Sequence, residues 1–339
     1  MAMDALTAPV ELESQAYFRV PADHTGAPSQ PLRLQPSFSL LGHSDRVDSV
    51  AFARDGLMLA SGSRDGTVRL WDVGARSHVA TLTGHVGVCA ALSSLAFSPD
   101  GKTLACGCDH GSVLIWDVEH RDLIARWSSS PALTRCSVAF SPFAPLLACN
   151  LTNRAVELFD VVGRQRLGAI DLDLRHPYIS CLALAADGKT LAVGGFDSAQ
   201  VVQLAPGLPS VILADTGFVS SLAFRPDSRM LAVGGQDVAG RSASGDGGFG
   251  TAHLFEIPGN RLIVSLPTDR DTPQGASVAF HADGKTIACG YSDGLIRLWH
   301  YSALSYEATL TTHEDCQVAF SANGEALAVA SGNAVSIWM

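Results

Sequence analysis

Positive charge is scarce in this sequence. Lys and Arg contribute 23 side chains against 33 from Asp and Glu, which gives a net charge of −10 over 339 residues. Charged residues of both signs make up only 17% of the chain, and no run of Lys or Arg is present. Sequence-independent binding to nucleic acid depends on neutralising phosphates with basic side chains. The composition therefore predicts that nucleic acid is not a partner.

Long apolar stretches are also missing. No segment approaches the roughly 18 unbroken apolar residues that a membrane span needs. Residues 1–20 carry acidic side chains early and lack a secretory pattern. We therefore expect a soluble, cytoplasmic protein with no membrane partner. Hydrophobic residues still make up 47% of the chain, which is enough for a substantial core.

The motif C-x-x-C is absent, although the chain has 8 cysteines. Cys106 and Cys108 are two residues apart on a predicted strand, so their side chains are expected on one face. The other cysteines lie singly within apolar runs. This pattern favours reduced thiols that pack as small hydrophobic side chains, and it predicts no metal ion and no cofactor. A redox or metal role is the less favoured alternative.

What the sequence does contain is a repeat. A short apolar phrase such as "VDSVAF" occurs seven times, with its last residues separated by 45, 43, 44, 40, 56 and 40 positions. Those last residues are Phe52, Phe97, Phe140, Leu184, Phe224, Phe280 and Phe320. Most of these phrases are followed by a turn signal such as Asp55-Gly56 and then by a second apolar run. A second polar turn and a third run, which usually ends on an aromatic residue, complete the pattern before a weaker fourth run.

Four short strands joined by tight turns leave no room for a helix in such a unit. One sheet of this size cannot bury both of its faces alone, whereas seven sheets packed around an axis can. The sequence therefore predicts an all-β fold, a seven-bladed β-propeller of four-stranded blades. A β-sandwich is the alternative, but it predicts irregular strand spacing without a period near 40 residues.

The segment "LLGHSDRVDSVAFARDGLMLASGSRDGTVRLWD" resembles the WD-repeat signature, with Gly42-His43 near its start and Trp71-Asp72 at its end. A second unit repeats the pattern with Gly84-His85 and Trp116-Asp117. The resemblance covers residues 32–339, and residues 1–31 would form an N-terminal extension, either a tail or a docking segment. In WD-repeat propellers the N-terminal segment typically completes the last blade. We therefore expect residues Leu34–Leu41 to pair with the strand that carries Trp338.

The resemblance also implies a hydrogen-bonded chain inside the first blade. Its members would be His43, Ser61, Asp65 and Trp71, which match the family's motif. A His, an Asp and a Ser could also suggest a hydrolase triad. The structural interpretation is favoured because the set recurs with the repeat and its Asp belongs to a turn. Only the first unit has the complete set, because the second carries Cys106 and His110 where the first carries Ser61 and Asp65.

The family's common partner-binding surface is the face called top, where the Gly-His loops and the second turns of the blades open. Candidate partner-binding residues on that face are Arg46, Arg64, Tyr178, Phe196, Phe218 and Gln236. The three aromatic residues are expected to cluster over the fourth and fifth blades, although each could instead pack against its own loop. A Ser/Gly-rich insertion at residues 238–250 would project from the same face, either to contact a partner or as a neutral insertion.

Taken together, these features predict a non-enzymatic protein-interaction scaffold. It would bind a peptide or protein partner mainly through the top face, as a monomeric propeller that serves as a subunit or adaptor in a larger complex. The alternative is an enzyme propeller, a hydrolase or lyase with a cation site at the channel mouth. Acidic and histidine side chains for such a site would come from Asp45, Asp48, Asp215, Asp271, His313, Glu314 and Asp315.

Overall fold

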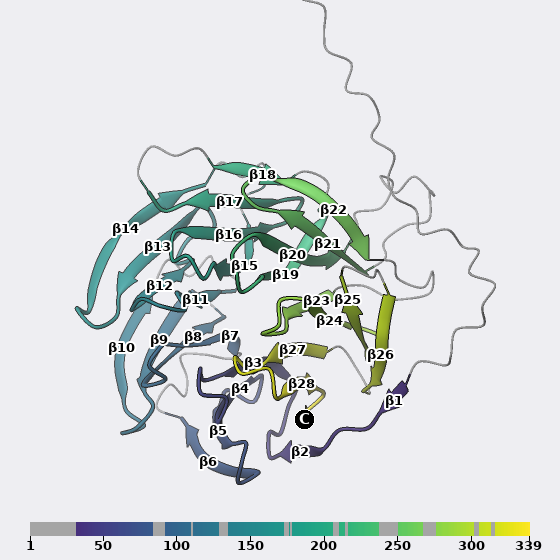
Figure 1. The fold of residues 1–339 in the computed structure, drawn as a ribbon. Coiled ribbons are helices and arrows are strands. Elements are labelled where there is room, and N and C mark those ends of the chain that lie inside the picture. Colours follow the sequence, from purple (N-terminus) through teal and green to yellow (C-terminus); the bar gives the residue numbers. More distant parts are fainter. Residues whose placement is uncertain are drawn as a thin grey trace, which may run out of the picture. The chain divides into compact units, whose positions relative to one another are not determined.

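A computed structural model describes most of the chain from residue 32 onward. The described residues are 32–83, 92–109, 111–128, 135–172, 176, 178–205, 210–213, 216–236, 250–266, 276–301, 305–312 and 316–339. Within these ranges the chain forms strands and no helix. The strands make seven sheets that stand around a common axis as the blades of a ring (Figure 1). The prediction of an all-β, seven-bladed β-propeller is confirmed.

The strands of the first four blades follow each other directly in sequence. Blade 1 consists of β3 (Val47–Phe52), β4 (Met58–Ser63), β5 (Val68–Asp72) and β6 (Ser77–Leu82). Blade 2 consists of β7 (Leu92–Phe97), β8 (Thr103–Cys108), β9 (Ser112–Asp117) and β10 (Leu123–Ser128). Blade 3 consists of β11 (Val138–Phe140), β12 (Leu146–Cys149), β13 (Ala155–Asp160) and β14 (Gln165–Asp171). Blade 4 consists of β15 (Ile179–Leu184), β16 (Thr190–Gly195), β17 (Ala199–Gln203) and β18 (Val211–Leu213).

The remaining blades include two strands from the start of the described chain. Blade 5 consists of β19 (Phe218–Phe224), β20 (Met230–Gln236), β21 (Gly250–Glu256) and β22 (Arg261–Leu266). Blade 6 consists of β23 (Ala276–Phe280), β24 (Thr286–Tyr291), β25 (Leu295–His300) and β26 (Ser305–Thr311), with β1 (Leu32–Leu34) at its edge. Blade 7 consists of β27 (Cys316–Phe320), β28 (Leu327–Ser331), β29 (Ala334–Trp338) and β2 (Phe38–Leu41).

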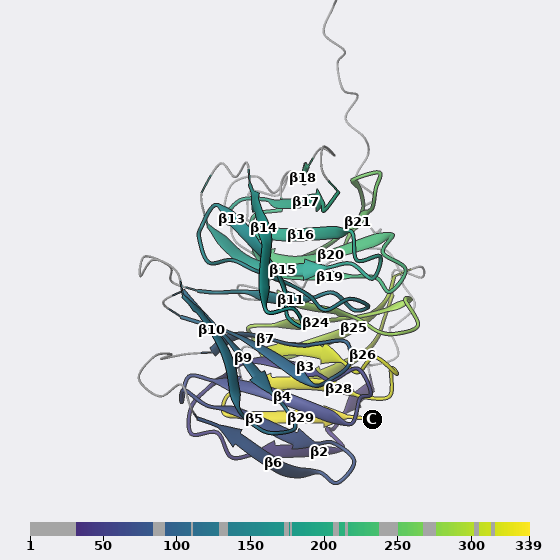
Figure 2. The ribbon, with the colours of Figure 1, turned by 90° about the vertical axis from the view of Figure 1, so that its left-hand side faces the viewer.

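In each blade four strands run antiparallel from an innermost strand near the axis outward, and β1 joins the edge of blade 6 in parallel. In Figure 2 the outermost strands β10 and β14 cross in front of the inner ones. We call the end of the ring where the innermost strands begin the top face. The second turns of the blades, between their second and third strands, open on this face as well. The opposite end, where the innermost strands finish, is called the bottom face.

Tight turns on the bottom face follow the turn signals in the sequence. In blade 1, Asp55 Oδ1 accepts a hydrogen bond from the Leu57 amide (2.9 Å). Gly56 adopts a φ of 74°, which costs glycine little because it has no Cβ. In blade 5 Ser228 takes the equivalent place with a φ of 63°. The Asp-Gly signals therefore identify hairpins between first and second strands.

Apolar side chains fill every space between neighbouring blades. Seven clusters of buried residues are present in the described part, and each combines side chains from two adjacent blades. Between blades 1 and 2, for example, Leu70 and Leu82 pack with Leu92 and Leu104. At about 25 cal/mol per Å² of apolar area, burial of this kind is the main stabilising contribution in the fold.

A serine on the innermost strand also links many blades to the next. Ser49 Oγ accepts a hydrogen bond from the Leu95 amide of blade 2 (3.0 Å), and the same bond recurs around the ring. The other pairs are Ser94 with Val138, Ser137 with Leu182, Ser221 with Val278, and Ser277 with Val318, all at 3.1 Å. Blades 4 and 7 carry Cys181 and Gln317 at this position.

The ring closes through antiparallel pairing of β2 with β29. Phe38 pairs with Ile337 and Leu41 with Ala334, so an N-terminal strand completes the last blade as expected. The expected range, Leu34–Leu41, was too long, because residues 32–34 form a separate strand, β1. This strand pairs in parallel with β26 of blade 6, with Leu34 opposite Leu310.

Six described cysteines are free thiols. Burial raises the pKa of Cys181 and Cys289 to about 12, so these thiols stay protonated and pack as apolar groups. Cys108 is disulfide-bonded. The expectation that the cysteines are all reduced is therefore wrong for Cys108.

Two expectations concern residues that the structure does not describe. The predicted N-terminal extension of residues 1–31 lies outside the described ranges, as do residues 238–249 of the inserted loop. No helix in the described part has the length and apolar character needed to cross a bilayer.

The closing strand offers a direct test of how the ring is held together. Leu40 is 3% exposed and packs between blades 7 and 1, whereas Leu41 on the same strand is 71% exposed. Leu40→Ala should lower the free energy of unfolding by about 2–5 kcal/mol, because it leaves a cavity at the closure. The control Leu41→Ala should change it by about 0.5 kcal/mol or less. Urea denaturation measures both, and equal effects would show that this strand does not hold the ring closed.

Candidate functional site

The first blade contains a continuous chain of hydrogen bonds between four side chains. Trp71 Nε1 donates to Ser61 Oγ (2.8 Å), which lies 2.7 Å from His43 Nε2. The other ring nitrogen, His43 Nδ1, lies 2.8 Å from Asp65 Oδ2. An ionised carboxylate only accepts, so Nδ1 carries the proton and Nε2 accepts from the Ser61 hydroxyl. The structure thus brings together all four residues that the motif suggested.

Asp65 also fixes the second turn of the blade. Its carboxylate accepts hydrogen bonds from the Thr67 hydroxyl (2.6 Å), the Thr67 amide (2.9 Å) and the Ser44 amide (3.0 Å). The Arg64 amide donates to the Arg46 carbonyl (2.9 Å), which ties this turn to the loop before β3. The chain of hydrogen bonds therefore sets the position of the two top-face arginines in blade 1.

Burial and hydrogen bonding shift the pKa values within this chain. Burial lowers the pKa of His43 and outweighs the opposing effect of Asp65, so the ring is neutral at pH 7. For Asp65, burial favours the neutral form, but hydrogen bonds from Thr67, His43 and backbone amides outweigh it and lower the pKa to about 2. The pair is therefore a neutral imidazole that donates to a carboxylate.

The other blades do not carry a serine at the position of Ser61. The residues in equivalent register on the second strand are Cys106, Cys149, Val193, Val233, Cys289 and Val329, all 0% exposed. Burial raises the pKa of the Cys106 and Cys149 thiols, which therefore act as small apolar groups. Packing replaces the polar link in these blades.

Arg46 and Arg64 lie on the top face on either side of Asp48. Asp48 Oδ1 is 2.9 Å from Arg46 Nε, and Asp48 Oδ2 accepts a hydrogen bond from Arg64 Nε (2.7 Å). The side chain of Asp48 is only 7% exposed, whereas that of Arg64 is 52% exposed. The hydrogen bond to Asp48 raises the pKa of Arg64. One buried carboxylate thus orients two accessible guanidinium groups.

A second top-face feature is an aromatic cluster over blades 4 and 5. The ring centroids of Tyr178 and Phe218 are 6.2 Å apart, and those of Phe196 and Phe218 are 6.1 Å apart in an edge-to-face arrangement. Exposed His176 packs edge-to-face against Phe196 at 5.9 Å. Gln236 pairs with Phe218 across β19 and β20 and lies beside the cluster. The three aromatic residues meet as expected, and Phe196 remains 51% exposed.

A family model agrees with this architecture. The model described as "WD domain, G-beta repeat" matches residues 34–72, 76–117, 209–237 and 275–300. The residues between these matches also form blades of four antiparallel strands, so that the ring has seven blades in all. The chain is a seven-bladed β-propeller that contains WD40 repeats. Pre-mRNA-processing factor 19 of Oryza sativa subsp. japonica is 44% identical over 45 residues, a match that spans 13% of this chain and 8% of that protein.

The geometry of this WD40 propeller gives little support to a hydrolase triad. Ser61, His43 and Asp65 are connected in the order that a serine nucleophile would need. However, Ser61 is 0% exposed and its oxygen already accepts from Trp71, so a substrate has no access to it. WD40 propellers are typically non-enzymatic interaction modules, and this chain of bonds has the features of a structural element.

The alternative cation site is only partly covered by the structure. Of its candidates, Asp48 is held between two arginines and Asp45 is exposed. No cluster of three or more His, Cys, Asp or Glu side chains that could hold a metal ion occurs among the described residues. The other candidates lie outside the described part: Asp215, Asp271, His313, Glu314 and Asp315.

Two features of the site were not found from the sequence. Asp48 was considered only as a candidate for a cation site at the channel mouth, whereas it orients Arg46 and Arg64. His176 extends the aromatic cluster, and its place two residues before Tyr178 in the same loop was the available signal.

The central serine can be tested by deletion of its hydroxyl. Ser61→Ala removes a partner from both Trp71 Nε1 and His43 Nε2, and should lower the free energy of unfolding by about 1–3 kcal/mol. Ser39→Ala is the control, because Ser39 makes one exposed contact with Ser336 and should cost about 0.5 kcal/mol or less. Thermal and urea unfolding measure the difference. Equal stability of the two variants would contradict a structural role for the chain of bonds.

The lowered pKa of His43 predicts a pH dependence of stability. As the pH falls below about 6.5, the unfolded chain takes up a proton at this histidine before the folded protein does. This contribution to stability is therefore complete above about pH 6.5 and declines below it. The variant His43→Gln should show a flatter decline in the free energy of unfolding between about pH 6.5 and 5. Identical slopes for wild type and variant would contradict the neutral buried imidazole.

Proposed function

We propose that the protein is a non-enzymatic interaction scaffold that binds a peptide or protein partner through its top face. It acts as a monomeric propeller that serves as a subunit or adaptor in a larger complex. The WD40 fold supports this proposal because it is typical of protein-interaction scaffolds. Fold alone does not fix the surface, so the proposal rests on particular side chains.

The aromatic cluster carries the proposal. Phe196 is among the few large hydrophobic side chains in the described part that are more than half exposed, and it is held by contacts with Phe218 and His176. Aromatic side chains are enriched among the residues that dominate binding energy, since they bury a large area with few rotatable bonds. Rings already fixed in place lose little conformational entropy when a partner covers them.

The arginine pair provides a polar counterpart on the same face. Asp48 holds Arg46 and Arg64 in defined positions, and the exposed part of each guanidinium remains available to carboxylates or carbonyls of a partner. Two anchor points on separate blades favour a partner that crosses the central channel. A protein or a folded peptide fits this requirement better than a small molecule does.

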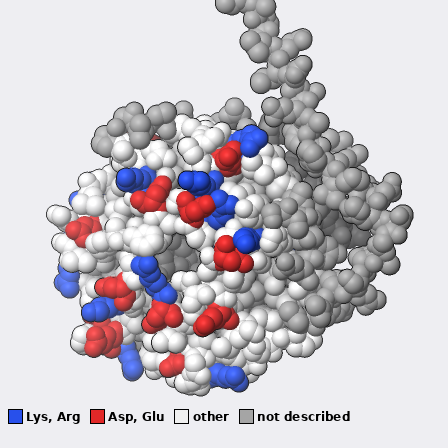
Figure 3. All heavy atoms as spheres, in the orientation of Figure 1, with Lys and Arg blue, Asp and Glu red and all other residues white. Residues whose placement is uncertain are grey.

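Charge favours a protein partner over nucleic acid. The chain carries a net charge of −10. On the face drawn in Figure 3, Lys and Arg side chains lie next to Asp and Glu side chains over the described part, without a continuous basic stripe. Such a mixed surface supplies little of the phosphate neutralisation on which nucleic-acid affinity depends.

Removal of the exposed rings tests the proposal. The double variant Phe196→Ala/Phe218→Ala should reduce recovery of the specific partner at least about tenfold in affinity purification with quantitative mass spectrometry. Leu57→Ala is the matched control, because Leu57 is 62% exposed in a turn on the bottom face.

Both variants are first compared with wild type by thermal unfolding, so that a loss of partner cannot be ascribed to misfolding. The proposal would be wrong if the double variant, folded as wild type, retained every partner. It would also be wrong if Leu57→Ala lost the same partners to the same extent.

A further inference from the structure

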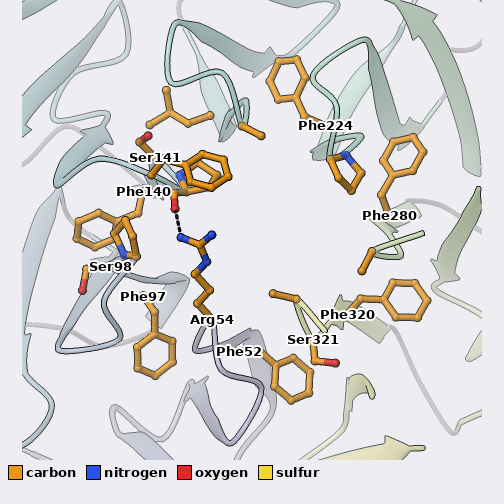
Figure 4. A pocket seen from close by; sticks show the side chains of 18 of the residues that line it. Phe52, Arg54, Phe97, Ser98, Phe140, Ser141, Phe224, Phe280, Phe320 and Ser321 are labelled. Atoms are coloured by element: carbon orange, nitrogen blue, oxygen red, sulfur yellow. Dashed lines mark hydrogen bonds between the residues drawn. The ribbon is translucent and has the colours of Figure 1, made fainter. Parts of the chain in front are cut away.

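The bottom face contains a cavity that the top-face function does not use. Its volume is about 480 Å³, and residues from the first turn of every blade line it. The last residue of each innermost strand surrounds the mouth, and the labelled ones encircle it in Figure 4. These residues are Phe52, Phe97, Phe140, Leu184, Phe224, Phe280 and Phe320. The repeated phrase of the sequence thus builds an apolar ring.

The side chains of this ring pack between neighbouring blades. Phe97, Phe140 and Leu184 are each 8% exposed and belong to the packing between blades. The phenylalanines of blades 1, 5, 6 and 7 are only half-buried. These four rings also pack against the inter-blade clusters and point away from the centre of the mouth in Figure 4. The exposed apolar side chain at the mouth is Phe143, which is 63% exposed.

Arg54 departs from the repeat at this mouth. It lies two residues after Phe52, and the residues in the equivalent places of the other blades are small or rigid and uncharged. Those residues are Pro99, Pro142, Ala186, Pro226, Ala282 and Ala322. Arg54 is therefore the single charged side chain among seven equivalent positions.

The guanidinium of Arg54 reaches into the mouth without an acidic partner. Arg54 Nη1 donates to the Pro142 carbonyl (3.1 Å), and the guanidinium lies 4.7 Å from the ring centroid of Phe143 (Figure 4). No carboxylate among the described residues forms an ion pair with it. Arg225, the other arginine of the lining, is paired with Asp227. The lining includes no Asp or Glu, although the whole chain is strongly acidic.

We propose that this bottom mouth binds, through Arg54 and Phe143, a peptide segment of a protein partner that presents an Asp or Glu side chain beside an aromatic one. Arginine offers a planar fork of donors that matches a carboxylate, and its remaining N–H groups are free to pair with one. Phe143, which is exposed beside Arg54, receives the neighbouring aromatic side chain. A cavity of this size accommodates a few side chains, which suits a peptide segment.

Two blocked, fluorescein-labelled peptide pools test the proposal. One has a fixed Phe-Glu pair and the other a fixed Phe-Gln pair, each flanked by the same randomised uncharged residues. Fluorescence anisotropy with the full chain should show the Phe-Glu pool binding at least about tenfold more tightly, because only it offers a carboxylate to Arg54. Arg54→Gln should remove this difference, and Arg54→Lys should restore part of it.

Arg76→Gln is the matched control, an exposed arginine of the same blade in the turn between β5 and β6. It should leave binding of the Phe-Glu pool unchanged, because Arg76 does not line the bottom mouth. The bottom-mouth proposal would be overturned by any of three results: no binding of the Phe-Glu pool up to about 1 mM protein, equal binding by Arg54→Gln, or equal binding of a pool with a fixed Ala-Glu pair.

Discussion

Burial of both faces of each sheet against its neighbours is the constraint on which the rest of the structure depends. A four-stranded blade of this size has apolar residues on both faces, and the seven inter-blade clusters bury them pairwise. No blade can satisfy this requirement alone, so the ring has to close. The pairing of β2 with β29 completes the last sheet. Because packing dominates, the polar network of blade 1 can be replaced by valine or cysteine elsewhere without loss of the fold.

The sequence predicted the fold well because each repeat unit contains short patterns that identify strands and turns locally. The phrase that ends at Phe52 and the turn at Asp55-Gly56 recur at nearly constant spacing, and each specifies a strand or a hairpin by itself. The pairing of β1 with β26 was missed because three residues carry no periodicity. The clustering of Tyr178, Phe196 and Phe218 followed from the position of each residue in its blade. The mouth around Arg54 did not, because its walls come from all seven blades and only the closed ring brings them together.

The two faces of the ring acquire their chemistry in different ways. On the top face, the aromatic cluster and the arginine pair come from loop positions that differ in every blade. On the bottom face, the repeated phrase supplies an almost uniform apolar ring, and one departure from the repeat, Arg54, gives it a charge. The residues of the repeated phrase that pack within and between blades therefore also surround the bottom mouth of the closed ring. The two surfaces can change independently, because they share no side chain.

The bonds from backbone amides to serines on the innermost strands form two arcs around the ring. They run from blade 1 to blade 4 and from blade 5 to blade 7, and Cys181 and Gln317 replace the serine at the two seams between these arcs. Between blades 4 and 5 the neighbouring Ser180 hydroxyl donates instead to the Val219 carbonyl. One seam is the closure between blades 7 and 1. The other, between blades 4 and 5, lies beneath the aromatic cluster, in which Tyr178 and Phe196 belong to one arc and Phe218 to the other. A ligand that covers these rings would clamp the two arcs together, so that its binding free energy would resist the opening of the ring at this seam.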